Sequence, residues 1–189
     1  MTTRPRSMAA ALALGFALLG AAAFAAPPGP GVGAAFPHAL SAPDQTGKQR
    51  TLDSLMGEKG LAVFFVRSAD WCPFCQRQLV DANRHLARFR ELGLGVVSVS
   101  VDEVAEIAAF ATAQQIGFTM LADPKGDINL ELGIRDPQYP VGSAAFGVPF
   151  PIVYVLDASG KVRLRYMEPT YRTRPDLEKV LQDVEALGL

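Results

Sequence analysis

The chain has 189 residues, of which 49% are hydrophobic and 20% are charged, and its formal net charge is −1 at pH 7. This length and composition fit one globular domain with a hydrophobic core of its own. Because the net charge is close to zero, the charge balance gives no reason to expect binding to nucleic acid or to an acidic membrane surface.

Residues 1–25 have the features of a secretory signal peptide. Arg4 and Arg6 precede an uncharged, Ala-rich stretch over residues 8–26, which contains the triplet Ala-Phe-Ala near its end. A basic start, an apolar stretch and a site of small residues predict export followed by cleavage after Ala25. We therefore expect a periplasmic or secreted protein, in a compartment where disulfides persist. A membrane-anchored protein that faces outside the cytosol is the alternative, because such a stretch is just long enough to cross a bilayer.

Pro and Gly dominate the next segment, residues 26–36, which reads "APPGPGVGAAF". A segment of this composition is expected to stay out of a packed core, and we predict a flexible linker here. The folded domain is then expected over residues 37–189.

Apolar runs of strand length alternate with segments of helical spacing over the rest of the chain. Strands are expected at residues 61–66, 94–102 and 118–121 and in a hairpin over 152–166, and helices at residues 73–91, 103–115, 128–134 and 174–188. The run "LAVFFV" is typical of a strand that is buried on both faces, as in a sheet covered by helices. The order of the elements predicts an α/β fold class with a central mixed β-sheet.

Both cysteines of the chain lie in the sequence "DWCPFCQRQL", where the helix predicted over residues 73–91 begins. Cys75 starts an apolar stripe with helical spacing, so its side chain is expected to face the core. Cys72 lies just before Pro73 and is expected to be exposed at the helix N-terminus. Unpaired N–H groups and the helix dipole stabilise a thiolate at that position. Cys72 is therefore predicted to be the nucleophile, and Cys75 is predicted to resolve the mixed disulfide.

A structural disulfide and a metal site are alternative interpretations of the C-x-x-C pair. A bridge between Cys72 and Cys75 closes only a short loop, so it adds little to stability. Zinc or copper needs more ligands, whereas His38 lies near the predicted linker and His85 lies away from the start of the helix. The favoured interpretation is a redox dithiol that needs no cofactor and no metal ion. A metal-binding chaperone with a thioredoxin fold is kept as a second alternative.

Five stretches of the sequence resemble the thioredoxin-like superfamily. Within it they resemble the redoxin branch, which includes the alkyl hydroperoxide reductase/thiol-specific antioxidant family. The stretches follow the family's order, at residues 41–55, 61–75, 95–102, 118–134 and 149–166. The resemblance spans nearly all of the predicted domain. It implies a thioredoxin-like fold, with a mixed sheet flanked by helices, and an oxidoreductase activity.

The thioredoxin pattern also implies a proline opposite the dithiol. In that pattern a cis-proline begins the strand that faces the dithiol, and its neighbour's backbone pairs with a bound peptide. Pro151 takes this position by its spacing to the following turn, and Phe150 precedes it. Trp71 and Phe74 flank Cys72, and together with Phe150 they are expected to form an apolar substrate-binding rim. Two trans prolines in an ordinary loop are the alternative.

The sequence departs from the motif of the peroxide-reducing family members, P-x-x-x-T-x-x-C. Counted back from Cys72, Ala69 stands in place of the Thr; counted back from Cys75, Cys72 stands there. Thr and Arg side chains stabilise the developing charge on the peroxide oxygens in those members. Here Arg67 or Arg135 would have to supply the guanidinium by a different route.

Proton transfer is a second point of departure. Ordinary thioredoxins place a buried acid on the strand under the dithiol, whereas residues 61–67 contain none, so slow reduction or resolution steps are expected.

Taken together, the sequence features predict an exported thiol–disulfide oxidoreductase that acts on protein thiols and disulfides together with a redox partner protein. A thiol-dependent peroxidase is the alternative within the enzyme class.

Overall fold

The computed structural model describes residues 1, 27–37 and 40–189. Apart from Met1, the predicted signal peptide lies outside the described residues. Within these ranges, no helix combines the length and the apolar character that crossing a bilayer requires.

A five-stranded mixed sheet forms the centre of the domain, in the order β5-β4-β3-β6-β7. The strands are β3 (Gly60–Phe65), β4 (Leu94–Ser100), β5 (Thr119–Ala122), β6 (Ile152–Asp157) and β7 (Val162–Met167). β3 runs parallel to β4 and antiparallel to β6. Every residue of β3 is buried, because helices and loops cover both faces of the sheet. The predicted α/β fold with a mixed central sheet is confirmed.

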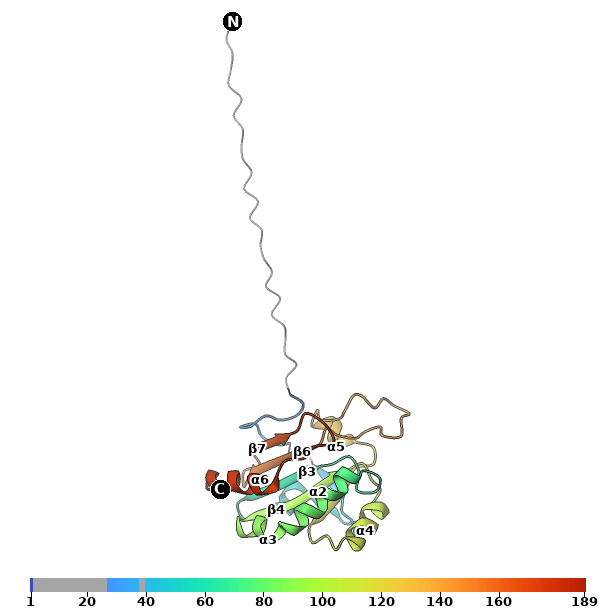
Figure 1. Cartoon of the computed structure of the whole chain (residues 1–189), viewed down its shortest axis with the longest axis vertical. Helices are drawn as coiled ribbons and strands as arrows, with labels where there is room; N and C mark the ends of the chain where they lie inside the picture. Colours follow the sequence, from blue (N-terminus) through green and yellow to red (C-terminus); the bar gives the residue numbers. More distant parts are fainter. Residues whose placement is uncertain (2–26, 38–39) are drawn as a thin grey trace.

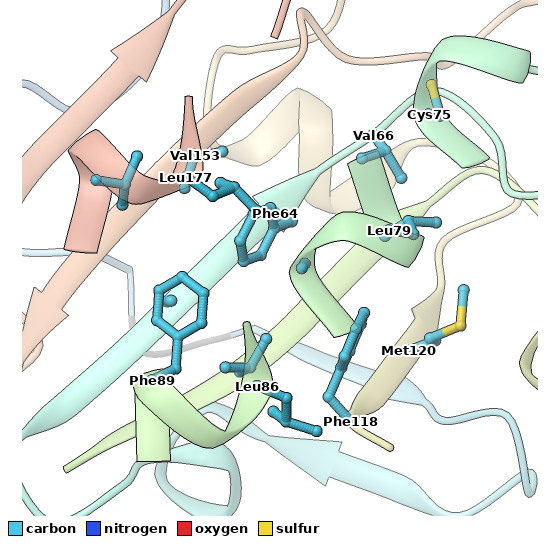
Figure 2. Packing of buried hydrophobic residues seen from close by; sticks show 14 of the residues in the cluster. Phe64, Val66, Cys75, Leu79, Leu86, Phe89, Phe118, Met120, Val153 and Leu177 are labelled. Carbon is cyan, nitrogen blue, oxygen red and sulfur yellow. The ribbon is translucent and has the colours of Figure 1, made fainter. Parts of the chain in front are cut away.

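Helices and a small hairpin surround this sheet (Figure 1). They are α1 (Leu52–Leu55), α2 (Pro73–Arg84), α3 (Leu86–Glu91), α4 (Val104–Ala113), α5 (Asp127–Glu131) and α6 (Leu177–Leu187), with the hairpin strands β1 (Ser41–Pro43) and β2 (Gln49–Thr51). Alternate residues of β3 face opposite layers. Phe64 belongs to an apolar cluster with residues of α2, α3, α4 and α6, and Phe65 belongs to a second cluster with residues of α1 and α5. Figure 2 shows Phe64 near Leu79 of α2, Phe89 of α3 and Leu177 of α6.

The helix predicted over residues 73–91 is divided at His85 into α2 and α3. The His85 ring Nδ1 lies 2.9 Å from the Asp81 carbonyl oxygen, so the side chain competes for an acceptor of the helical backbone. The predicted apolar stripe nevertheless survives the break. Its members remain buried, namely Cys75, Leu79, Ala82, Leu86 and Phe89.

His85 also ties the junction of α2 and α3 to α6, and we predict that this contact makes stability depend on pH. The hydrogen bond with Asp81 and the contact with Glu178, whose Oε1 lies 3.0 Å from Nε2, raise the pKa of His85. The contribution is therefore present below the unfolded-state value of 6.5 and is lost as pH rises through the higher folded-state pKa. In urea titrations, Glu178→Gln is expected to lower the free energy of unfolding by about 0.5 kcal/mol more at pH 6 than at pH 8. An equal loss at both pH values would contradict this prediction.

The segment predicted as a flexible linker is ordered where the structure describes it, so that prediction is wrong over residues 27–36. The amide of Gly33 donates to the Val162 carbonyl, and the amide of Phe36 donates to the Gly160 carbonyl, each at 2.8 Å. The Phe36 ring is fully buried. The physical reason is that β7 is an edge strand, whose unpaired backbone groups supply partners that composition does not reveal.

Gly29 lets this segment approach the sheet closely. Its φ is +82°, and a Cβ at this position would collide with the Ile134 side chain and the Tyr154 hydroxyl. We predict that Gly29→Ala lowers the free energy of unfolding by about 1–2 kcal/mol. Gly31→Ala is the matched control, since a Cβ there meets nothing within 4 Å, and it should be close to neutral in urea unfolding. Equal effects of the two substitutions would show that the close approach is unimportant.

Candidate active site

Cys72 and Cys75 form a disulfide at the N-terminus of α2, with their Cα atoms 5.2 Å apart. Pro73 is the first residue of the helix and Cys72 is its N-cap, as predicted; Cys72 Sγ accepts the backbone N–H of Cys75 at 3.3 Å. Cys75 is fully buried, which confirms its predicted orientation. Cys72 is only 3% exposed, so the expectation of an exposed sulfur is wrong for the disulfide form. The reason is that Cys72 packs into the same apolar cluster as its partner.

A guanidinium group that the sequence analysis missed contacts this disulfide. Arg174 Nη2 lies 3.3 Å from Cys75 Sγ, and Arg174 Nε donates to Gln78 Oε1 at 2.6 Å. Its Nη1 donates to the backbone carbonyls of Tyr171 and Thr173. Burial lowers the pKa of Arg174 to about 10, so the group is still a cation at neutral pH. It favours the thiolate form of Cys75 once the disulfide is reduced.

Arg174 was expected to open the C-terminal helix predicted over residues 174–188, but α6 begins only at Leu177. Asp176 is the N-cap of α6, and its carboxylate accepts the Glu178 N–H at 3.0 Å. Pro175 was the available signal, because a residue that precedes proline is disfavoured in the helical region. Arg174 therefore belongs to the loop that crosses the start of α2.

Arg67 is the second guanidinium near the dithiol. It is 7% exposed and lies over three aromatic rings, with centroid distances of 5.2 Å for Trp71, 4.8 Å for Tyr139 and 4.6 Å for Tyr171. Such stacking holds a buried cation without a carboxylate. Of the two arginines that the sequence offered, Arg67 is thus placed beside the loop that carries Cys72. Arg135 packs elsewhere, over the ring of Phe146 at 4.9 Å.

A buried carboxylate, Asp102, supports the loop that leads to Cys72. Its Oδ1 accepts the Ser68 hydroxyl at 2.6 Å, and its Oδ2 accepts the Ala69 N–H at 2.6 Å and the Ser100 hydroxyl at 2.7 Å. Asp102 is 2% exposed. The sequence analysis looked for an acid only on the strand before the dithiol, whereas Asp102 follows the neighbouring parallel strand β4. The carboxyl ends of parallel strands meet at one edge of a sheet, and this was the available signal.

The loop over residues 68–71 is fixed by further hydrogen bonds. The Ser68 hydroxyl oxygen accepts the N–H groups of Asp70 and Trp71 at 2.9 and 3.0 Å. Gln76 Nε2 donates to the carbonyls of Ala69 and Asp70 at 2.9 and 2.7 Å. Because both sides of the loop are tied down, Cys72 is held at the start of α2.

The predicted substrate-binding rim is only partly assembled. Trp71 is 44% exposed beside Cys72, and the half-buried Phe74 lies edge-on to Tyr171, with ring centroids 6.1 Å apart. Phe150 instead packs against the apolar cluster on the other face of the sheet. The structure therefore adds Tyr171 to this region and does not bring Phe150 into it.

Pro151 lies at the end of the sheet from which the loop to Cys72 departs, because the adjoining Ile152 pairs with Phe65. Its role as a site residue stays a prediction. The expected cis bond is not found, since every peptide bond among the described residues is trans. The chain enters β6 in extended form, and the Phe150 N–H donates to the Ile134 carbonyl at 2.8 Å. This path accommodates the proline in its trans form.

In the described part of the chain, no three His, Cys, Asp or Glu side chains gather as they would around a metal ion.

The AhpC/TSA family model matches residues 32–165 of this chain. The chain belongs to the AhpC/TSA family. This AhpC/TSA protein is 28% identical over 124 residues to a putative peroxiredoxin of Mycobacterium tuberculosis strain H37Rv, in an alignment that covers 66% of this chain and 77% of that protein. It is 25% identical over 123 residues to peroxiredoxin Bcp of Escherichia coli K12, with coverage of 65% and 77%.

Two solved structures share the fold of this AhpC/TSA protein. Peroxidoxin BcpB of Mycobacterium tuberculosis superposes with a TM-score of 0.67 at 23% identity, covering 85% of this chain and 97% of that one. Peroxiredoxin Q of Xanthomonas campestris gives a TM-score of 0.68 at 21% identity, with coverage of 80% and 93%. The predicted redoxin branch and thioredoxin-like fold are confirmed, and the protein is an oxidoreductase of a thiol peroxidase family.

Proposed function

We propose that this AhpC/TSA protein is a thiol-dependent peroxidase that cycles through the Cys72–Cys75 disulfide. One thiolate of the pair attacks a hydroperoxide oxygen; an S–O bond forms, the O–O bond breaks, and the alkoxide or hydroxide leaves as an alcohol or water after taking up a proton. The second thiol then attacks the resulting sulfenic acid, expels water and closes the disulfide. A dithiol partner returns the pair to the reduced state. This proposal replaces protein disulfide exchange, the main function predicted from the sequence, with its peroxidase alternative.

The observation that carries the proposal is the contact between Arg174 and Cys75. A cation 3.3 Å from the sulfur favours the thiolate form, and thiolate is the form that attacks peroxide. The same guanidinium can donate to an oxygen on which negative charge develops. Arg174 can thus supply the guanidinium group that the sequence analysis expected from Arg67 or Arg135. The names of the relatives, which are peroxiredoxins, agree with this proposal.

Rapid mixing of the reduced full chain with hydrogen peroxide tests the proposal. The chain has a single tryptophan, Trp71, next to Cys72, so its fluorescence is a convenient signal for oxidation. We expect oxidation far faster than that of a free cysteine thiolate at the same pH. A rate equal to that of the free thiolate would overturn the proposal. Trapping of sulfenic acid in Cys72→Ser and in Cys75→Ser identifies the attacking sulfur: the sequence analysis predicts Cys72, whereas the Arg174 contact favours Cys75.

Disulfide exchange with proteins is the second candidate function, and the exposed indole of Trp71 beside Cys72 favours it. An apolar ring at the rim of a dithiol provides a contact for a polypeptide substrate. Reduction of a protein disulfide such as that of insulin, with peroxide reactivity no greater than that of free cysteine, would support this candidate over the peroxidase.

Export to the periplasm or the outside of the cell is also part of the proposal. It rests on the composition of residues 1–25 and on the C-P-F-C pair, which can stay oxidised there. Protein recovered from the periplasmic or extracellular fraction should begin at Ala26. Recovery from the cytosol with Met1 or Thr2 at its N-terminus would overturn this part.

A further inference from the structure

A basic cavity lies beside the dithiol, and the peroxidase cycle leaves it without a role. Its volume is about 710 Å³, within the range typical of small-molecule sites. Arg77, Arg84, Arg172 and Arg174 line it, against one carboxylate, Asp81. Because the net charge of the whole chain is −1, this excess of positive charge is a local feature.

The positive charge of the cavity is not neutralised by neighbouring acids. In the described part of the chain, none of the four lining arginines forms an ion pair with a carboxylate. Asp81 lies 3.7 Å from the Nδ1 atom of His85. The charges of Arg67 and Arg77 add to burial in lowering the pKa of Arg174. An anion that enters the cavity would relieve this repulsion.

The cavity also has an apolar part, formed by Phe74, Phe110, Pro175 and Leu177. It reaches the disulfide through Arg174, which lines the cavity while its Nη2 lies 3.3 Å from Cys75 Sγ. The two cysteines are at most 3% exposed and neither lines the cavity, so a reductant reaches Cys75 only when the Arg174 side chain moves aside, a smaller change than a folded partner would need. A small molecule paired with Arg174 would already lie close to Cys75.

We propose that this cavity binds a small carboxylate-bearing thiol that reduces the Cys72–Cys75 disulfide. The proposal rests on the peroxidase function above, because it supplies the reduction that ends each turnover. The carboxylate pairs with Arg77 and Arg172, which line the cavity near Arg174, and the guanidinium of Arg174 gives up its place beside Cys75 to the incoming thiolate.

The reduction takes place in two exchange steps. In the first, the thiolate attacks Cys75 Sγ; a new S–S bond forms, the Cys72–Cys75 bond breaks, and Cys72 leaves as a thiolate. That thiolate is stabilised at the helix N-terminus, where Cys72 Sγ accepts the Cys75 N–H at 3.3 Å. In the second step, another molecule of the thiol attacks the bound thiol's sulfur and releases its disulfide, leaving Cys75 as a thiolate. Two thiols are thereby oxidised as one protein disulfide is reduced, and their protons pass to the two cysteines.

The test compares two matched thiols as reductants of the oxidised full chain, N-acetylcysteine and its uncharged amide. Each rate, followed by Trp71 fluorescence, is divided by the rate of the same thiol with a small-molecule disulfide, which removes differences in intrinsic reactivity. We expect a preference of about tenfold for the carboxylate-bearing thiol at low ionic strength, and a smaller preference as salt is added. Equal normalised rates would overturn the proposal.

Variants then locate the effect. Arg77→Gln combined with Arg172→Gln is expected to reduce the preference to about twofold or less. Lys125→Gln combined with Lys161→Gln makes the same change in net charge at exposed positions outside the cavity, and it should retain the preference. A preference that survives in the double arginine variant overturns the assignment to this cavity. Because peroxide reactivity is measured separately in the oxidation step, failure of the peroxidase proposal is distinguishable from failure of this one.

Discussion

Replacing Arg174 with glutamine is expected to slow the oxidation of the reduced protein by hydrogen peroxide by about tenfold to hundredfold at pH 7. A hydrogen bond from a charged donor contributes about 1.5–3 kcal/mol, and each 1.36 kcal/mol of barrier corresponds to about a factor of ten in rate. Glutamine is shorter than arginine, so it removes both the charge and the donor that lie beside Cys75. Fluorescence-detected stopped flow, with rates measured as a function of pH, checks the prediction. The rate should recover partly at high pH, where the thiolate forms without help from a cation.

Two controls separate this effect from a disturbed fold. Arg163→Gln removes a cation from β7 that pairs with Asp157 at 3.5 Å, and it should oxidise at the rate of the unmodified protein. Because Arg174 also donates to loop carbonyls, urea unfolding of Arg174→Gln must show that the domain remains folded. A folded Arg174→Gln protein that oxidises at the unmodified rate throughout the pH range would show that this guanidinium does not activate the thiolate.

Asp102→Asn is expected to lower the free energy of unfolding by about 2–4 kcal/mol. Three donors converge on this carboxylate at 2.6–2.7 Å, two from hydroxyl groups and one from the Ala69 backbone. An asparagine offers one acceptor oxygen and turns an NH₂ group toward the remaining donors. At least one buried donor is then left without a partner, which costs about 1–3 kcal/mol in addition to the lost charge-assisted bonds.

Asp70→Asn is the matched control for Asp102→Asn, because it makes the same chemical change in the same loop at an exposed carboxylate. Its effect should stay within about 0.5 kcal/mol. Urea titrations followed by circular dichroism give both values. Similar losses for the two variants would contradict a special role for the buried carboxylate.

Local signals explain why the dithiol could be placed from the sequence. A buried apolar run, followed by Cys-Pro at the start of helical spacing, specifies a strand, a loop and a helix N-terminus whatever the rest of the chain does. The orientation of Cys75 followed from the same spacing. The burial of Cys72 did not, because it depends on packing within an apolar cluster assembled from several elements.

The parts of the site that were not predicted come from distant segments. Arg174 lies 99 positions from Cys75 and Asp102 lies 34 positions from Ser68, so no local pattern joins them. The order of the strands, with β3 between β4 and β6, decides which loops meet at the dithiol. Single-sequence reasoning predicted the elements, but it had no measure of which polar residue from another loop would reach the sulfur.

Segments of the same chain cover part of each edge of the central sheet. On the β7 side, residues 33–36 pair with residues 160–162. On the β5 side, Asp44 forms a β-bridge with Leu121, and the backbone N–H of Gln45 donates to the Met120 carbonyl at 3.1 Å. An open edge invites a strand from another molecule, and a covered edge resists it. Strand addition at these covered positions would therefore have to displace one of these segments, whereas contacts through the helical faces would leave both in place.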